Sequence, residues 1–207
     1  MKYTKQIVST TLIAFCLYGC TAFKKNIEKP VVVAMPDRNV PVNFNSTALN
    51  AKYINNLSKE DIAEHFLKGF DSEAKTTKNV TLKTDESGAD FIVRIIAVNI
   101  NESSKIEKIA DEKSPYNGQD MVLNTIECAA ELEITDAKDK TKKYSHCYNT
   151  KSRSEKLKNN RDLNDLISGT NKDHTSYRTK LLDDSISVNL SQDVGRRVWV
   201  PITRRIS

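Results

Sequence analysis

The side chains best suited to catalysis, three histidines and a few acidic pairs, are scattered along the sequence rather than grouped in a motif. The sequence has no Gly-rich phosphate loop, no His-Glu-x-x-His, no Gly-x-Ser-x-Gly and no Cys-x-x-Cys pair. His146 and His174 could still meet across the fold beside a carboxylate, as a hydrolase would require. We therefore expect no catalytic residues, no metal and no cofactor, and keep a hydrolase with an unrecognised His/carboxylate site as the alternative.

Cys20 ends a segment with the layout of a secretory signal peptide. Lys2 and Lys5 precede an apolar run over residues 7–17, and small Gly19 comes directly before the cysteine. A membrane-spanning helix needs about 20 apolar residues, and this run is shorter and contains Ser and Thr. The pattern favours a cleaved signal, with a retained membrane anchor as the alternative.

Residues 17–20, Leu-Tyr-Gly-Cys, resemble a bacterial lipobox. The resemblance implies that residues 1–19 are removed as a signal peptide, that the Cys20 sulfur carries a lipid, and that residues 20–29 form a lipidated tether. Stable anchoring needs more than one acyl chain, and a lipoprotein cysteine carries several. Thr21 in place of Asp favours, by the same resemblance, the outer membrane, with the domain on its periplasmic side.

The charge balance argues against a nucleic-acid-binding protein. The chain has 32 Lys and Arg against 27 Asp and Glu, and two lysines leave with the signal peptide, so the formal charge falls from +5 to about +3. The densest basic cluster could contact an anionic glycan, lipid or acidic protein, or could be a solvated chain end. It consists of Arg196, Arg197, Arg204 and Arg205, which flank Trp199.

Cys128 and Cys147 are the two cysteines left for the exported domain. Residues 126–134 alternate apolar and mostly acidic side chains, which predicts a strand with one buried face. A turn at 136–139 followed by a return strand over 140–149 would complete a hairpin.

In a symmetric hairpin, Thr135 pairs with Lys140 and the two cysteines lie opposite each other. Because thiols oxidise in an exported protein, this register predicts a Cys128–Cys147 disulfide. The same register turns Tyr144 away from the core, whereas a slip by one residue would reverse it. Two free thiols therefore remain the alternative.

Local patterns predict the other elements. Ser58 can cap a helix over 59–76, whose apolar residues recur every four positions. The remaining expected elements are strands at 31–35, 80–82 and 89–100, the last with both faces covered, a polar connection at 102–119, a short helix at 162–169 and a long helix from Thr175 to Pro201. Together they predict one α/β (α+β) domain over 30–207, with a mixed, mainly antiparallel sheet of about five strands and two main helices packed on it.

The entry to the longest strand, Ser87-Gly88-Ala89-Asp90-Phe91-Ile92-Val93, resembles the corresponding segment of penicillin-binding-protein activator and curli-secretion-type lipoproteins. The resemblance implies a small docking domain without enzymatic activity. We accordingly expect an accessory lipoprotein that binds another envelope component, a protein or a glycan.

Overall fold

The computed structural model of the chain describes residues 27–48, 53–55, 57–114, 116–157 and 185–207. Its elements are β1 (Val31–Ala34), β2 (Val42–Thr47), α2 (Lys59–Thr76), β3 (Val80–Lys83), β4 (Phe91–Lys108), β5 (Asp120–Asp136), β6 (Lys143–Leu157), α4 (Ile186–Arg197) and α5 (Trp199–Ile206). Cys20, His174, the short helix expected at 162–169 and the expected helix start at Thr175 lie outside these ranges.

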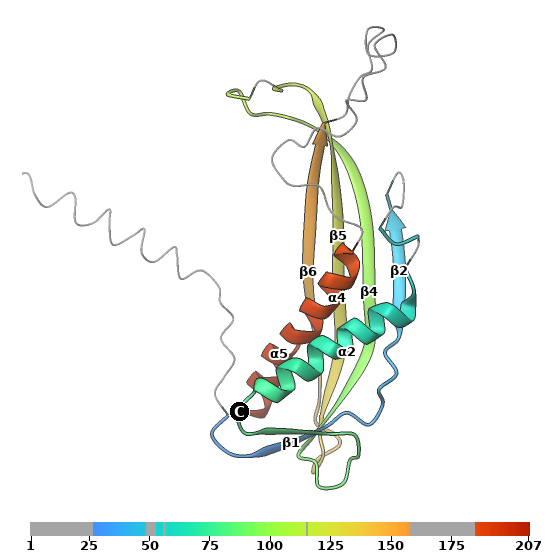
Figure 1. The fold of residues 1–207 in the computed structure, drawn as a ribbon. Helices are drawn as coiled ribbons and strands as arrows, with labels where there is room; N and C mark the ends of the chain where they lie inside the picture. Colours follow the sequence, from blue (N-terminus) through green and yellow to red (C-terminus); the bar gives the residue numbers. More distant parts are fainter. Residues whose placement is uncertain (1–26, 49–52, 56, 115, 158–184) are drawn as a thin grey trace, which may run out of the picture.

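One mixed sheet contains all six described strands (Figure 1), in the order β3-β1-β4-β5-β6 with β2 also paired to β4. β1 and β2 lie parallel to successive parts of one β4 edge, and β1 is also parallel to β3. β4, β5 and β6 are antiparallel neighbours. The predicted α/β domain with a mixed sheet is confirmed. The additional strand is β2, whose two apolar residues, Val42 and Phe44, are too few to stand out in the sequence.

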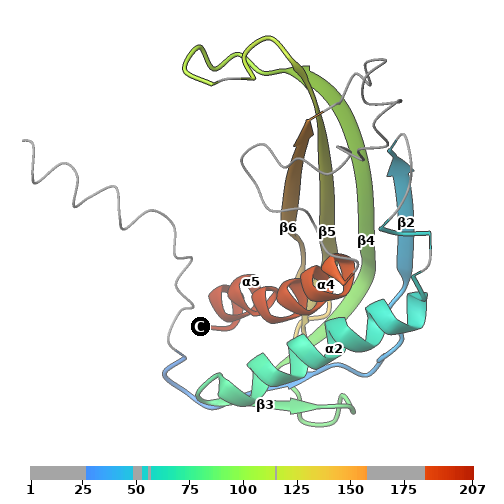
Figure 2. The same ribbon diagram turned by 45° about the horizontal axis from the view of Figure 1, so that its top comes forward.

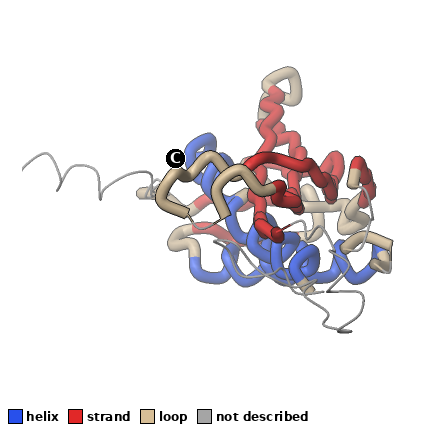
Figure 3. The backbone as a smooth tube through the Cα atoms, turned by 90° about the horizontal axis from the view of Figure 1, so that it is seen from above, coloured by secondary structure: helices blue, strands red, loops and turns tan. Residues whose placement is uncertain are grey.

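The three described helices lie on the same side of the sheet (Figure 3). β4 adapts to this one-sided core through a bulge between Ile95 and Ala97. Val93 and Ile95 before the bulge and Val98 after it are buried, whereas Ile96 is 50% exposed. The extra residue shifts the alternation so that both groups of apolar side chains reach the core face. The prediction that both faces are covered near the middle of this strand is therefore wrong.

Helix α2 begins at the predicted cap. The Ser58 hydroxyl accepts a hydrogen bond from the Asp61 N–H at 3.2 Å, which satisfies one of the free donors of the first turn. The predicted stripe is buried, with Ile62 and Phe66 fully covered. The expected helix over 59–76 is confirmed.

Helices α2 and α4 cross with their backbones in contact. A Cβ atom added to Gly69 would lie 2.1 Å from the Gln192 carbonyl oxygen, and one added to Gly195 would lie 2.1 Å from the Phe66 carbonyl oxygen. Each helix thus supplies a glycine at the point where the other's backbone passes. A side chain larger than hydrogen at either position would force the helices apart.

The C-terminal helix does not end at Pro201. Helix α4 ends at Arg197 and α5 begins at Trp199, which places Pro201 in a first turn. The N–H groups in the first turn of a helix have no carbonyl acceptor within that helix, so a proline there costs no helical hydrogen bond and is tolerated. Trp199 is fully buried, and its indole Nε1–H donates to the Phe70 carbonyl at 2.8 Å, which ties α5 to α2.

Cys128 and Cys147 do not form the predicted disulfide. Thr135 pairs with Lys143 rather than Lys140, so Cys128 lies opposite Thr150 and Cys147 lies opposite Glu131. The register differs from the predicted one by three residues, an odd number, which puts the two cysteines on opposite faces of the sheet. Both are free thiols: Cys128 is buried in the core and Cys147 is exposed. Burial raises the pKa of the Cys128 thiol to about 12.

Candidate functional site

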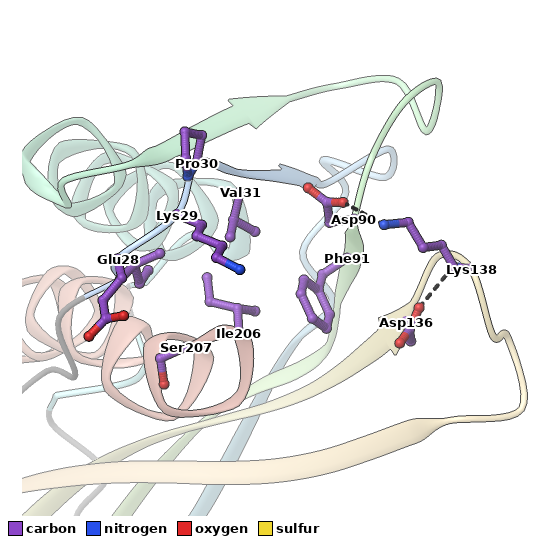
Figure 4. Close-up of a pocket in the computed structure, with 11 residues that line it drawn as sticks. Glu28, Lys29, Pro30, Val31, Asp90, Phe91, Asp136, Lys138, Ile206 and Ser207 are labelled. Atoms are coloured by element: carbon purple, nitrogen blue, oxygen red, sulfur yellow. Dashed lines mark hydrogen bonds and ion pairs between the residues drawn. The ribbon is translucent and has the colours of Figure 1, made fainter.

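A pocket of about 640 Å³ opens at the end of the sheet where β1 begins and β5 ends (Figure 4). Its volume lies in the range of small-molecule sites. Four segments that are distant in the sequence line it: residues 27–31, residues 90–91, Asp136 with Lys138, and Ile206 with Ser207. We call it the end pocket.

Asp90 joins three of the elements around the end pocket. Its N–H donates to the Val32 carbonyl at 2.8 Å, and its carboxylate Oδ2 accepts from the Val32 N–H at 3.0 Å. Its own carbonyl accepts from the Ala137 N–H at 2.9 Å, so Asp90 also holds the turn after β5. The hydrogen bond from Val32 lowers the pKa of the Asp90 carboxyl and keeps it ionised. This is the structural reason for an aspartate at the entry to the long strand.

Lys138 places one amino group at the rim. Its Nζ lies 3.4 Å from Asp90 Oδ1, and its side chain is 83% exposed. The turn is fixed by Asp136, whose Oδ1 accepts from the N–H groups of Lys138 at 2.8 Å and of Asp139 at 3.1 Å. The position of Lys138 is therefore set by the hairpin turn.

Lys29 supplies a second amino group, from the segment that leads into β1. Figure 4 shows Lys29 and Ile206 on one side of the end pocket, with Phe91 facing them. The preceding Ile27 is buried, and its carbonyl accepts from Asn79 Nδ2 at 2.7 Å. The described part of the predicted tether is thus packed against the domain and forms a wall of the pocket.

The end pocket has the chemistry of a binding site. Among the described residues that line it, apolar walls carry two amino groups and three acidic side chains, and none is a His or a Cys. With its lowered pKa, Asp90 is a weak base, which does not favour acid–base catalysis. Within the described ranges, no three metal-ligating side chains are grouped so that they could hold an ion. The arrangement suits a small amphipathic group, held by apolar contacts and oriented by Lys29 and Lys138.

The predicted arginine cluster lies at the surface near the C-terminal end of the chain. Arg197 Nε lies 2.9 Å from an Asp193 carboxylate oxygen on the same helix. The Arg205 guanidinium lies 3.5 Å from the centroid of the Tyr144 ring, a cation–π contact that joins α5 to β6. All four arginines are exposed. The cluster therefore remains at the surface, and two of its members contact neighbouring side chains.

Of the two histidines considered for catalysis, His174 lies outside the described residues. The backbone of His146 lies opposite Leu132 in the β5–β6 ladder. The His65 ring Nδ1 is 2.8 Å from the Asp61 carbonyl of its own helix. Sequence reasoning singled out Asp90 through its motif, but it missed Lys29, Lys138 and Ile206, because only the tertiary fold brings them together.

Several solved structures of bacterial proteins have a distant similarity to the chain. A hemagglutinin homologue from Helicobacter pylori matches with a TM-score of 0.40 at 13% identity, over 92% of each chain. The hypothetical protein CT253 from Chlamydia trachomatis matches with a TM-score of 0.35 at 13% identity, over 85% of this chain and 98% of its own. A minor lipoprotein from Acinetobacter baumannii matches with a TM-score of 0.28 at 13% identity, over 79% of this chain and 91% of its own.

No protein-family model matches the chain, and a search of curated sequences finds no significant match. None of the helices in the described ranges is long and apolar enough to cross a bilayer.

Proposed function

We propose that this chain is a lipid-anchored accessory protein of the bacterial cell envelope, held in the outer membrane through Cys20, which binds another envelope component and catalyses no reaction. The observation that carries the proposal is the place of the end pocket. It is lined by the residues through which the chain passes from the predicted tether into β1.

The number of residues between the anchor and the pocket limits their separation. Seven steps along the chain join Cys20 to Ile27, and a fully extended chain advances at most about 3.6 Å per residue. The end pocket therefore lies within about 25 Å of the lipidated residue. Lys29 and Lys138 at its rim are close enough to meet an anionic or amphipathic group that projects from the membrane surface.

Membrane fractionation of the Cys20→Ala variant tests the anchor. We expect the wild-type protein to sediment with membranes, to leave them only with detergent, and to show the mass of an acylated Cys20 peptide. Cys147→Ala is the matched control, because it removes an exposed thiol without touching the lipobox. If Cys20→Ala still sediments with membranes and resists high salt, the lipid-anchor proposal is wrong.

A further inference from the structure

A second concave surface lies away from the end pocket, between α2 and β3. This groove has a volume of about 540 Å³. Asp71, Ala74 and Lys75 of α2 form one wall, and residues 80–84 form the other. Figure 2 shows β3 running beneath α2, and we call the space between them the β3 groove.

The backbone of β3 has one unused edge among the described strands. β3 is the last strand in the sheet order, and β1 is its only described neighbour. The Val31 and Met35 N–H groups donate to the carbonyls of Asn79 and Lys83, both at 2.9 Å, so the odd-numbered residues face β1. Because successive residues of a strand point their backbone groups in opposite directions, Val80 and Leu82 direct theirs away from β1 and along the groove.

The floor of the β3 groove is apolar. Val80 and Leu82 are half-buried and pack against the main core, and Ala74 of α2 is buried. Thr81 and Lys83 are exposed on the other face of the strand. An added strand would place every second side chain on this floor and the others beside Thr81 and Lys83.

The charge around the β3 groove is positive. Asp71 is neutralised by Arg38, whose Nη1 and Nη2 donate to the two carboxylate oxygens at 3.0 and 2.7 Å. Lys75 and Lys83 are exposed and have no ion pair with a described residue. A lysine on a sheet edge repels basic strands, and it attracts carboxylates.

We propose that the β3 groove binds an extended acidic segment of a partner protein as an added strand. Its backbone pairs with Val80 and Leu82, its apolar side chains lie on the floor, and its carboxylates lie beside Thr81 and meet Lys83. Lys75, on the α2 wall, adds to the positive charge that attracts the segment. The inference goes beyond the proposed function, because it assigns a second binding surface and a partner class to it, a protein strand with alternating acidic and apolar residues.

The test uses the full-length lipidated protein, labelled with ¹⁵N and purified in detergent, with synthetic peptides as probes. The peptide Ac-Glu-Val-Glu-Val-Glu-NH₂ should shift the amide signals of Val80 and Leu82 saturably. A peptide of the same sequence that is N-methylated at every residue has no backbone N–H to pair in either strand direction and should not bind. A Lys-Val-Lys-Val-Lys peptide should be repelled. A double variant, Lys75→Gln with Lys83→Gln, should weaken binding of the acidic peptide by about tenfold, because two exposed positive charges at the groove are lost.

Three results would overturn the proposal. The first is an absence of shifts at Val80 and Leu82, and the second is equal binding of the acidic, basic and N-methylated peptides. The third is concentration-dependent self-association with the same shifts and no peptide, which would make a second copy of this chain the occupant. The assay contains no membrane, so a negative result leaves the anchoring test intact, and failure of the Cys20 anchor leaves the peptide test intact.

Discussion

Replacing Gly69 with alanine places a methyl group where α2 and α4 are in backbone contact. The added Cβ would lie 2.1 Å from the Gln192 carbonyl oxygen, and real Cβ atoms essentially never approach another atom closer than 3.0 Å. The obstructing atom belongs to the backbone and cannot rotate away. The two helices must therefore separate by about 1 Å, and the core side chains between them lose contact.

Two effects of opposite sign decide the stability of Gly69→Ala. In an isolated helix, alanine is more favourable than glycine by about 0.8–1 kcal/mol. Overpacking a core costs about 1–3 kcal/mol, and the rigid backbone obstacle at this crossing places the cost at the upper end. We expect the free energy of unfolding to fall by about 2 kcal/mol.

Urea unfolding followed by circular dichroism measures this change. Lys68→Ala, at an exposed neighbouring position of α2, is the matched control and should stay within about 0.5 kcal/mol of wild type. Gly195→Ala meets the Phe66 carbonyl at the same crossing, so the double variant should lose less than the sum of the single variants. A Gly69→Ala variant as stable as wild type, or more stable, would refute the account of the crossing.

Three further predictions concern the Asp90 carboxylate, the two free thiols and the Trp199 indole. Because the pKa of Asp90 is lower in the folded than in the unfolded protein, the carboxylate stabilises the fold above its unfolded pKa, and this stabilisation is lost as the pH falls through the folded pKa. Asp90→Asn should therefore lower the free energy of unfolding at neutral pH and make it depend less on pH in acid, as measured by urea unfolding at a series of pH values. The same loss of stability in acid as for wild type would contradict this. A thiol reagent should modify Cys147 in the native protein and Cys128 only after unfolding. If neither cysteine reacts in the denatured, unreduced chain, the two form a disulfide after all. Trp199→Phe should cost about 1–3 kcal/mol in thermal or urea unfolding, because it removes the indole hydrogen bond to the Phe70 carbonyl and leaves a space in the core; a neutral effect would mean that the indole contributes little.

Elements with local signals are predictable from the sequence. The cap at Ser58 and the four-residue spacing from Ile62 depend on neighbours within a few turns, and α2 forms where they predict it. The apolar run from Phe91 likewise forms the first part of β4.

Features that depend on distant partners are not predictable in this way. The bulge at Ile96 shifts a strand by one residue without any glycine or proline to mark it. The hairpin register depends on the turn after Asp136, where a change of three residues separates Cys128 from Cys147. The end pocket is assembled from four segments, and nothing in the sequence near Lys29 or Ile206 indicates that they meet.

Site-specific photo-crosslinking in cells tests most directly whether the chain docks an envelope component at the end pocket. A benzoylphenylalanine at position 29 stands at this pocket, and one at Lys113 lies in the exposed connection between β4 and β5, at the other end of the sheet. The account predicts a discrete adduct from position 29 that is absent from position 113 and is lost when Cys20 is replaced with alanine. No adduct from position 29, or the same adducts from both positions, would contradict it.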